Sequence, residues 1–402
     1  MTGSIVVTGA GMVTAVGDTP QAILKALLAR TPLAAARLDD GGVVASIAEF
    51  DPKRYILRKG AKDLSRTSQL ACSAAGANAR AIEGVAAEDV GVVFGSAWGS
   101  LTTVIEFERE AYLQGARFVD PILFTETVSN VPAGQVAILY GWSAFNVTVS
   151  SGSASGLAGL RQALAFLEEG RALVAVAGGG DELNLQLLRS LRRSGIVTDR
   201  LGSLPLAEGR SGPVGGEGAC FLTIESEEHA TSRGSVALAA VRASGSRFVP
   251  GGTAGNGGAR ESMAGLIRQL TALAGLELPA VDLVVLSASG LLDGDVEEAG
   301  AVLDVFGDGP DAAPVMVPKS ILGETWGASG PLAAAVAIEV MRTSVVPAAP
   351  HGFVLSPDLL GLNLPGETLR RPVRNALILD RTDSGHQLGL VLSLTEPHDA
   401  HD

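Results

Sequence analysis

The chain has 402 residues, of which 47% are hydrophobic and 18% are charged, and its formal net charge at pH 7 is −13. A chain of this length and balance buries enough apolar surface to fold, which excludes intrinsic disorder for most of it. Because the net charge repels phosphates and anionic lipids, we expect neither nucleic acid nor a membrane surface as a partner.

Short β-branched runs bounded by glycine alternate with longer Ala- and Leu-rich stretches, which predicts a layered α/β fold. The predicted strands are 3–8, 90–94, 146–150, 172–177, 219–225, 235–242, 282–287 and 374–380. The predicted helices, each with one apolar face, are 20–30, 65–84, 155–169, 183–193, 259–275 and 330–342. Frequent Gly and Pro predict loops at 243–260 and 344–373. Two comparable blocks, 1–240 and 241–402, follow from this order.

The first strand leads into Val6-Val-Thr-Gly-Ala-Gly-Met12, which is similar to the start of a dinucleotide-binding fingerprint. Thr14 stands where the third glycine is due, and no acidic residue follows at the distance that a ribose contact needs. A tight turn therefore explains these glycines better than a nucleotide does. The chain has neither a zinc-type His/Cys spacing nor a P-loop, and we expect no cofactor and no metal.

The two cysteines, Cys72 and Cys220, are too few for a disulfide framework and lie among small or apolar residues, which indicates core packing in a reducing cytoplasm. The N-terminus lacks a signal-peptide pattern, and no stretch approaches the ~18 apolar residues of a membrane span. Of the five histidines, none precedes residue 229 and none lies between 230 and 350. Imidazole chemistry is excluded from those parts of the chain.

The stretch 146–156 passes from a strand through small residues into a helix, and Ser153 occupies the turn between them. Such a turn exposes a side chain at a helix N-terminus, where the helix dipole stabilises a nucleophile. Helix capping and tight packing are the simpler explanation of the serines and glycines there, and the local sequence favours it. Both interpretations remain open from the local sequence.

Several motifs together resemble those of the β-ketoacyl synthases, and the similarity extends from the first strand to the last. After the opening Val-Thr-Gly-x-Gly, they are Asn130-Val-Pro-Ala-Gly-Gln135, Val176-Ala-Gly-Gly179, Arg210-Ser-Gly-Pro-Val-Gly-Gly-Glu-Gly218 and Lys319-Ser-Ile-Leu-Gly-Glu-Thr-Trp-Gly-Ala-Ser-Gly330. The resemblance implies a thiolase-like fold, with two similar βαβαβ-type halves, 1–240 and 241–402, in a layered α-β-α-β-α domain.

The chain departs from this family at the catalytic positions. The family's nucleophilic cysteine corresponds to Ser153, and its two histidines correspond to Ser287 and Glu324, while the lysine is retained as Lys319. The C-terminal F-G-F-G-G-x-N element is replaced by Asp383-Ser-Gly-His-Gln387. A serine hydroxyl is far less acidic than a thiol, and an anionic Glu324 opposes the negative charge that decarboxylation develops. We therefore expect a chain that does not itself catalyse condensation.

This pattern is similar to the chain length factors of type II polyketide synthases. The resemblance implies a heterodimer with an active ketosynthase, in which this subunit shapes the tunnel that limits polyketide or polyene length. The family's tunnel helix corresponds to the segment after Ser100, where Leu101, Val104 and Glu108 share one face. Packing in the core or at the dimer seam explains that face equally well.

Acyl carrier protein is acidic, so a chain of net charge −13 repels it on average, and we expect docking mainly on the partner. A solvated surface is the simpler explanation of the one local basic run, which is Lys53, Arg54, Arg58, Lys59, Lys62 and Arg66, with Arg192 and Arg193 elsewhere. Two other functions remain open. One is a serine acyltransferase or hydrolase with Ser153 as nucleophile and Glu324 or His386 as base, and the other is a malonyl-carrier-protein decarboxylase.

Overall fold

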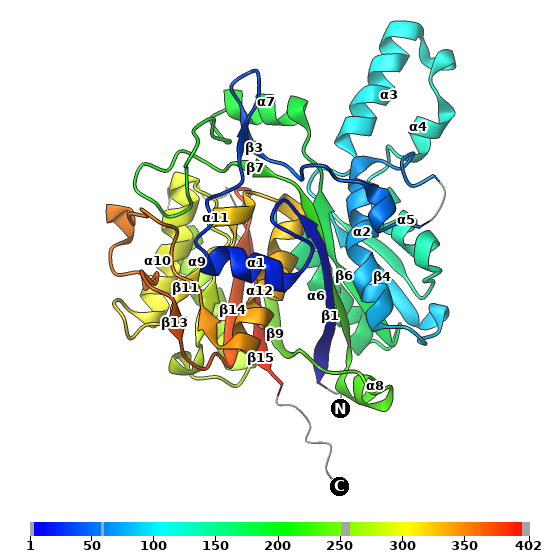
Figure 1. Ribbon diagram of the computed structural model, residues 1–402. Coiled ribbons are helices and arrows are strands. Elements are labelled where there is room, and N and C mark those ends of the chain that lie inside the picture. Colours follow the sequence, from blue (N-terminus) through cyan, green and yellow to red (C-terminus); the bar gives the residue numbers. More distant parts are fainter. Residues whose placement is uncertain (1–3, 58–59, 251–257, 396–402) are drawn as a thin grey trace.

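The computed structural model describes residues 4–57, 60–250 and 258–395 (Figure 1). Its main sheet has ten strands in the order β11-β10-β14-β15-β9-β1-β8-β6-β4-β5. These strands are β1 (Ile5–Thr14), β4 (Val90–Gly95), β5 (Asn146–Val149), β6 (Val174–Asp181), β8 (Gly218–Ser226), β9 (Ala239–Phe248), β10 (Leu283–Val285), β11 (Val315–Met316), β14 (Asn375–Arg381) and β15 (His386–Leu394). Smaller sheets join β2 (Ala36–Arg37), β3 (Val43–Ala45) and β7 (Gly215–Gly216), and β12 (Val345–Val346) with β13 (Leu369–Arg370).

The sheet joins two five-stranded halves where β1 pairs antiparallel with β9, with Ile5 opposite Val241. The strands from the first part of the chain lie on one side of this junction, and those from β9 onward lie on the other. The division of the chain at residue 240 into two separate halves stays a prediction.

Helices cover both faces of each half. They are α1 (Pro20–Leu28), α2 (Arg66–Ala81), α3 (Leu101–Gln114), α4 (Pro121–Thr125), α5 (Val131–Tyr140), α6 (Ser155–Glu168), α7 (Leu185–Arg193), α8 (Glu227–Ser232), α9 (Gly258–Leu273), α10 (Leu292–Phe306), α11 (Lys319–Leu322) and α12 (Ser329–Thr343). The central core places α6 and α12 against strands of both halves. A second core packs α2 and α5 on the outer face of the first half, and a third packs α9 and α10 on that of the second.

The α-β-α-β-α layering expected from the sequence is therefore present. Helix α12 shows why it occupies the middle layer: Ser329 to Met341 are all buried, so this helix is apolar on nearly every side. A helix of that kind needs neighbours all round, which only the central layer provides. Both cysteines are buried in core clusters, as expected.

The predicted tight turn at Gly9 and Gly11 is wrong, because β1 continues to Thr14 and both glycines lie inside the strand. A Cβ on Gly11 would lie 2.2 Å from the carbonyl oxygen of Ala74 in α2. The glycines are therefore required by the close approach of α2 to the strand, a long-range contact that local spacing does not reveal.

Other boundaries also differ from the prediction. The predicted loop 243–260 is strand β9 as far as Phe248 and helix α9 from Gly258, and the part at 251–257 lies outside the described residues. Strand β15 was not predicted, although polar and apolar side chains partly alternate along residues 386–394. The predicted helices are all present, with ends that differ by up to a few residues.

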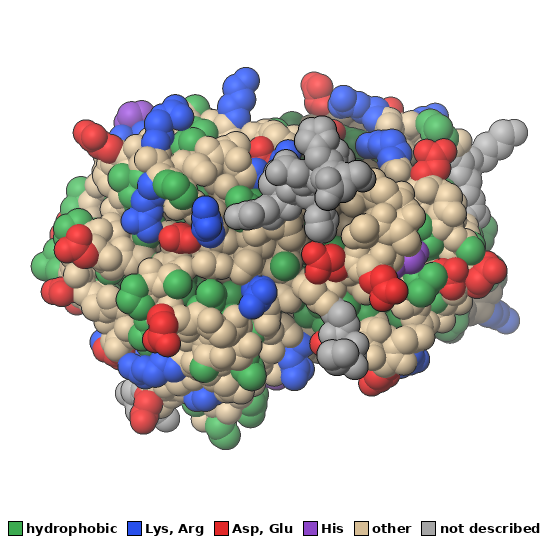
Figure 2. Space-filling model, turned by 90° about the horizontal axis from the view of Figure 1, so that it is seen from below, with side chains coloured by type: hydrophobic (Ala, Val, Ile, Leu, Met, Phe, Trp, Pro, Cys, Tyr) green, Lys and Arg blue, Asp and Glu red, His purple; other side chains and the backbone are tan. Residues whose placement is uncertain are grey.

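Among the described residues, no helix has the length and apolar character needed to cross a membrane. The face of the molecule seen from below carries both acidic and basic side chains, separated by uncharged surface (Figure 2). This mixture gives that face no continuous basic area of the kind that nucleic acid requires.

Candidate functional site

One cavity of about 230 Å³ collects the residues singled out from the sequence. Ser153, Ser287, Lys319 and Glu324 all line it, although they come from three separate segments. The structure thus brings together the nucleophile position, both histidine positions and the retained lysine. Their individual catalytic roles stay predictions.

Ser153 lies in the turn between β5 and α6, as the strand-to-helix pattern predicted. Its hydroxyl donates to the backbone carbonyl of Arg381 at 3.0 Å, which joins residues 228 positions apart. The proposed bases are engaged elsewhere, because the His386 ring lies edge-on to Phe248 at 5.5 Å and Glu324 bonds other groups. Among the described residues, no base therefore holds the Ser153 hydroxyl in the arrangement that a serine nucleophile needs.

Glu324 forms a buried ion pair with Lys319, with 2.7 Å between Oε2 and Nζ. Its other oxygen accepts from the backbone N–H of Trp326 at 2.8 Å and from the Ser329 hydroxyl at 3.0 Å. Burial alone lowers the pKa of Lys319, but opposing charge, above all that of the Glu324 carboxylate, raises that pKa above its usual value. Lys319 is thus held as a cation whose nearest partner is the residue at the second histidine position.

Ser287, at the first histidine position, donates through its hydroxyl and its backbone N–H to Oε1 of Glu298, at 3.2 and 2.9 Å. Oε2 of Glu298 lies 3.9 Å from Nε of Arg381, and neither atom has a hydrogen bond to a described residue. Burial raises the pKa of Glu298 to about 6, against the opposing effect of the Arg381 charge. Ser287 therefore contributes a hydroxyl that is already committed to a carboxylate.

A further buried acid, Asp380, lies next to this cluster at the end of β14. Burial raises its pKa to about 8, because the attraction of Lys319 only partly offsets desolvation and the carboxylates of Glu324 and Glu298 add to it. Its Oδ2 has no hydrogen bond to a described residue. The acid is thus predominantly protonated near neutral pH.

The sequence argument did not single out Glu298, Asp380 and Arg381. A signal was available for two of them, since Asp380 and Arg381 end a strand, 375–381, that is otherwise largely apolar. Charged residues at the end of an apolar strand indicate a functional site. Glu298 carries no comparable local signal, because an acid in the middle of a helix is ordinarily at the surface.

Helix α3 begins at Leu101, as expected, but its predicted tunnel face does not reach this cavity. Leu101 and Val104 are half-buried and Glu108 is exposed. Together with α4, the helix projects from the body of the molecule (Figure 1). These residues can therefore line a tunnel only together with a surface that another chain contributes.

The predicted basic run does not form one free surface. Arg66 pairs with Glu217 at 2.8 Å, and Arg192 pairs with Asp40 at 3.4 Å. Lys53, Arg54, Lys62 and Arg193 are exposed, while Arg58 and Lys59 lie outside the described residues. The solvated surface of the simpler explanation fits the four exposed residues, whereas Arg66 and Arg192 are held in ion pairs.

Comparisons with known proteins point to one family. Residues 2–230 match the model of the β-ketoacyl synthase N-terminal domain, and residues 238–352 match that of the C-terminal domain. A 3-oxoacyl-[acyl-carrier-protein] synthase 2 from Vibrio harveyi is 26% identical over 368 residues, which cover 85% of this chain and 87% of that protein. A Schizosaccharomyces pombe protein named as a mitochondrial 3-oxoacyl-[acyl-carrier-protein] synthase is 28% identical over 271 residues, and the match spans 64% of this chain and 63% of that protein.

The fold is shared with solved ketosynthases. The structure described as the ishigamide ketosynthase/chain length factor superimposes with a TM-score of 0.89 at 22% sequence identity, covering 98% of this chain and 100% of that one. At this identity the likeness concerns the fold alone. The thiolase-like fold implied by the sequence resemblance is thereby confirmed.

Proposed function

Because the chain belongs to the β-ketoacyl synthase family, we propose that it is a non-condensing subunit of the chain-length-factor type that pairs with an active ketosynthase. In this proposal the partner condenses units delivered by acyl carrier protein, which docks mainly on the partner. This chain shapes the tunnel that limits the length of a polyketide or polyene. The complex is cytoplasmic, and this chain alone is catalytically inactive.

The observation that carries the proposal is the chemistry of the cavity around Ser153. The Ser153 hydroxyl has no base and donates to a carbonyl, so it is a poor nucleophile. Glu324 places a carboxylate, already saturated by three donors, where decarboxylation needs a neutral donor. With Ser287 bonded to Glu298, no group in the cavity replaces the missing imidazoles.

An exposed apolar arm supports the need for a partner. Helices α3 and α4, with the turn between them, project from the molecule (Figure 1), and the Tyr112 side chain on α3 is 89% exposed. Further exposed apolar side chains of this arm are Leu113, Phe118, Ile122 and Phe124. Isolated chains rarely expose so many large apolar groups together, whereas protein interfaces use them.

The edge of the sheet adjoining this region also supports pairing. Strand β5 is the last strand of its half, so its outer edge is unpaired among the described residues. Thr148 in this strand has a buried hydroxyl without a hydrogen bond to a described residue. An open strand edge is a template for a strand from another chain. A partner covering β5 and the arm would enclose the α3 face that carries Leu101 and Val104.

The proposal is tested by expressing this chain with its active ketosynthase and measuring product length. The variant Val104→Phe enlarges a half-buried side chain on the proposed tunnel face and is expected to shorten the product. A matched control is Val236→Phe, which makes the same change at a position 73% exposed on another part of the surface. The control is expected to leave product length unchanged.

Two results would contradict the proposal. One is a purified chain that, without any ketosynthase, condenses malonyl units. The other is an intact complex in which Val104→Phe and Val236→Phe give the same product lengths as the unmodified chain. An acyl-enzyme formed on Ser153 from acyl carrier protein would favour the serine acyltransferase instead.

A further inference from the structure

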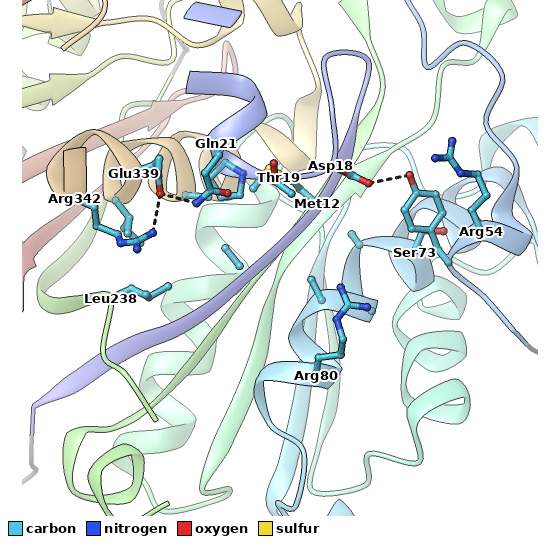
Figure 3. Close-up of a pocket in the computed structure, with 18 of the residues that line it drawn as sticks. Met12, Asp18, Thr19, Gln21, Arg54, Ser73, Arg80, Leu238, Glu339 and Arg342 are labelled. Carbon is cyan, nitrogen blue, oxygen red and sulfur yellow. Dashed lines mark hydrogen bonds and ion pairs between the residues drawn. The ribbon is translucent and has the colours of Figure 1, made fainter. Parts of the chain in front are cut away.

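A second cavity, of about 370 Å³, lies away from the site around Ser153 and shares no lining residue with it (Figure 3). Strand β1 forms its floor, and helices α2 and α12 form two of its walls. Asp18 and Thr19 with the first turn of α1, and the segment containing Arg54 and Tyr55, complete the rim. Its size falls in the range of small-molecule sites, roughly 300–1,000 Å³.

Part of the lining is apolar and firmly packed. Met12 on β1 and Ile338 on α12 are nearly fully buried, with 2% and 3% of their surface exposed. Ala77 on α2 and Leu238 before β9 complete this apolar side and are half-buried. An apolar ligand body placed here would displace water from the half-buried surfaces of Ala77 and Leu238 and from the small area that Met12 and Ile338 leave open.

The polar side chains on the other side of the cavity differ in whether they have hydrogen-bond partners. Glu339 accepts from Gln21 at 2.7 Å and from Arg342 at 3.0 Å, and Figure 3 shows these three side chains joined on one side of the cavity. The guanidinium of Arg80 lies across from them, on α2. The Arg80 backbone carbonyl accepts from the N–H of Ile82 at the end of α2, but its guanidinium has no hydrogen bond and no ion pair to a described residue.

Arg54 at the rim is likewise without a side-chain partner among the described residues. The lining therefore holds three guanidinium groups against two carboxylates, those of Asp18 and Glu339. This excess is one positive charge, which suits a monoanion. A dianion would meet repulsion from the two carboxylates.

We propose that this cavity binds a small organic carboxylate. Its apolar body packs on Met12, Ala77 and Ile338, and its carboxylate accepts hydrogen bonds from Arg80, whose planar fork matches a carboxylate. Arg54 adds positive charge at the entrance. The inference is independent of the function proposed above, because none of these residues belongs to the site around Ser153 or to the arm.

The test is calorimetric titration of the purified full chain with octanoate, compared with octanol and octylamine as uncharged and cationic probes of the same length. We expect saturable binding of octanoate that is at least about tenfold tighter than that of either comparison probe, equivalent to about 1.4 kcal/mol. Arg80→Gln is expected to remove this preference. Octyl phosphate is expected to bind more weakly than octanoate.

Arg193→Gln is the matched control, because Arg193 is also an exposed arginine in the last turn of a helix but lines neither cavity. This control is expected to bind octanoate as the unmodified chain does. Ala77→Phe provides a second variant, which fills the apolar side and is expected to abolish binding without removing a charge.

Each of three results would overturn the proposal. They are octanol binding as tightly as octanoate, unchanged octanoate affinity in a folded Arg80→Gln variant, and octyl phosphate binding more tightly than octanoate. If Arg80→Gln does not fold, an unchanged octanoate affinity in the folded Ala77→Phe variant also overturns the proposal. Circular dichroism of each variant shows which of them are folded.

Discussion

Lys319 and Glu324 are joined by a buried ion pair, in which the ammonium nitrogen lies 2.7 Å from a carboxylate oxygen and each side chain is 7% exposed. Only four residues separate them, and the short helix α11 ends between them. The lysine that the chain shares with the β-ketoacyl synthase motif is therefore neutralised by the residue that replaces a histidine. Breaking this ion pair would therefore change both the charge at this site and the stability of the fold.

Breaking this ion pair is predicted to be costly. Lys319→Met leaves the Glu324 charge buried without its cation, which is expected to lower the free energy of unfolding by about 3–5 kcal/mol. Urea unfolding at pH 7 measures the change. The double variant Lys319→Met/Glu324→Leu is expected to recover most of the loss, because it removes both charges. Arg342→Met, which breaks the more exposed pair with Glu339, is the control and is expected to cost no more than about 1 kcal/mol.

Removing the Ser153 hydroxyl is predicted to leave the complex active. In Ser153→Ala, turnover by the complex with the active ketosynthase is expected to stay within about twofold of normal, since one hydrogen bond to a carbonyl contributes roughly 1 kcal/mol to stability and nothing to condensation. Rates of carrier-bound malonyl consumption provide the measurement. Loss of turnover in an intact complex would show that Ser153 is a nucleophile after all.

The buried Asp380 is predicted to make stability depend on pH. Its pKa of about 8 in the folded chain lies above the ordinary value of 3.8, so the folded state binds the proton more tightly. Stability from this group is therefore full below about pH 4 and decreases as pH rises toward 8. Asp380→Asn removes this dependence.

Urea unfolding at pH 5, 7 and 9 compares Asp380→Asn with the unmodified chain. We expect the stability of the variant relative to the unmodified chain to increase from pH 5 to pH 9, whatever constant offset the amide introduces. A relative stability that is independent of pH would mean that Asp380 is ionised throughout this range in the folded chain.

The exposed arm is predicted to hold the partner without stabilising this chain. Tyr112→Ser, combined with Leu113→Ser, is expected to weaken co-purification with the ketosynthase by at least about tenfold, because large apolar anchors dominate interface energies. The thermal midpoint of the isolated chain is expected to change little. Val236→Ser is the matched control, since Val236 is 73% exposed but lies outside the arm. Equal loss of binding in both variants would argue against the arm as the interface.

Gly11 is predicted to tolerate no side chain. In Gly11→Ala the new Cβ would lie 2.2 Å from the Ala74 carbonyl oxygen, so α2 must shift away from β1 and the chain is expected to lose at least about 2 kcal/mol of stability. Gly134→Ala in α5 is the control, because a Cβ there meets nothing within 4 Å. Helix propensity predicts that this control is neutral or more stable by up to about 1 kcal/mol. Thermal and urea unfolding distinguish the two.

Much of the framework followed from local patterns. The strand-to-helix turn at Ser153 and the apolar helix at 330–342 were predictable because strand alternation, helix spacing and glycine punctuation depend on near neighbours in the chain. The expectation that Ser153 replaces the family's nucleophilic cysteine rested on a single letter within a recognisable motif. The sequence by itself thus determined the α/β class and indicated that the usual catalytic set is absent.

Only the tertiary structure decided what the replacing residues do. It showed the Ser153 hydroxyl bonded to a carbonyl 228 residues away, and Gly11 required by a helix rather than by a turn. It also gathered Glu298, Asp380 and Arg381 around the same cavity. These contacts join segments that no local pattern relates, and burial there sets the charge of each group. The hydrogen-bond partners and the burial of each side chain, and not residue type alone, therefore decide the chemistry of this site.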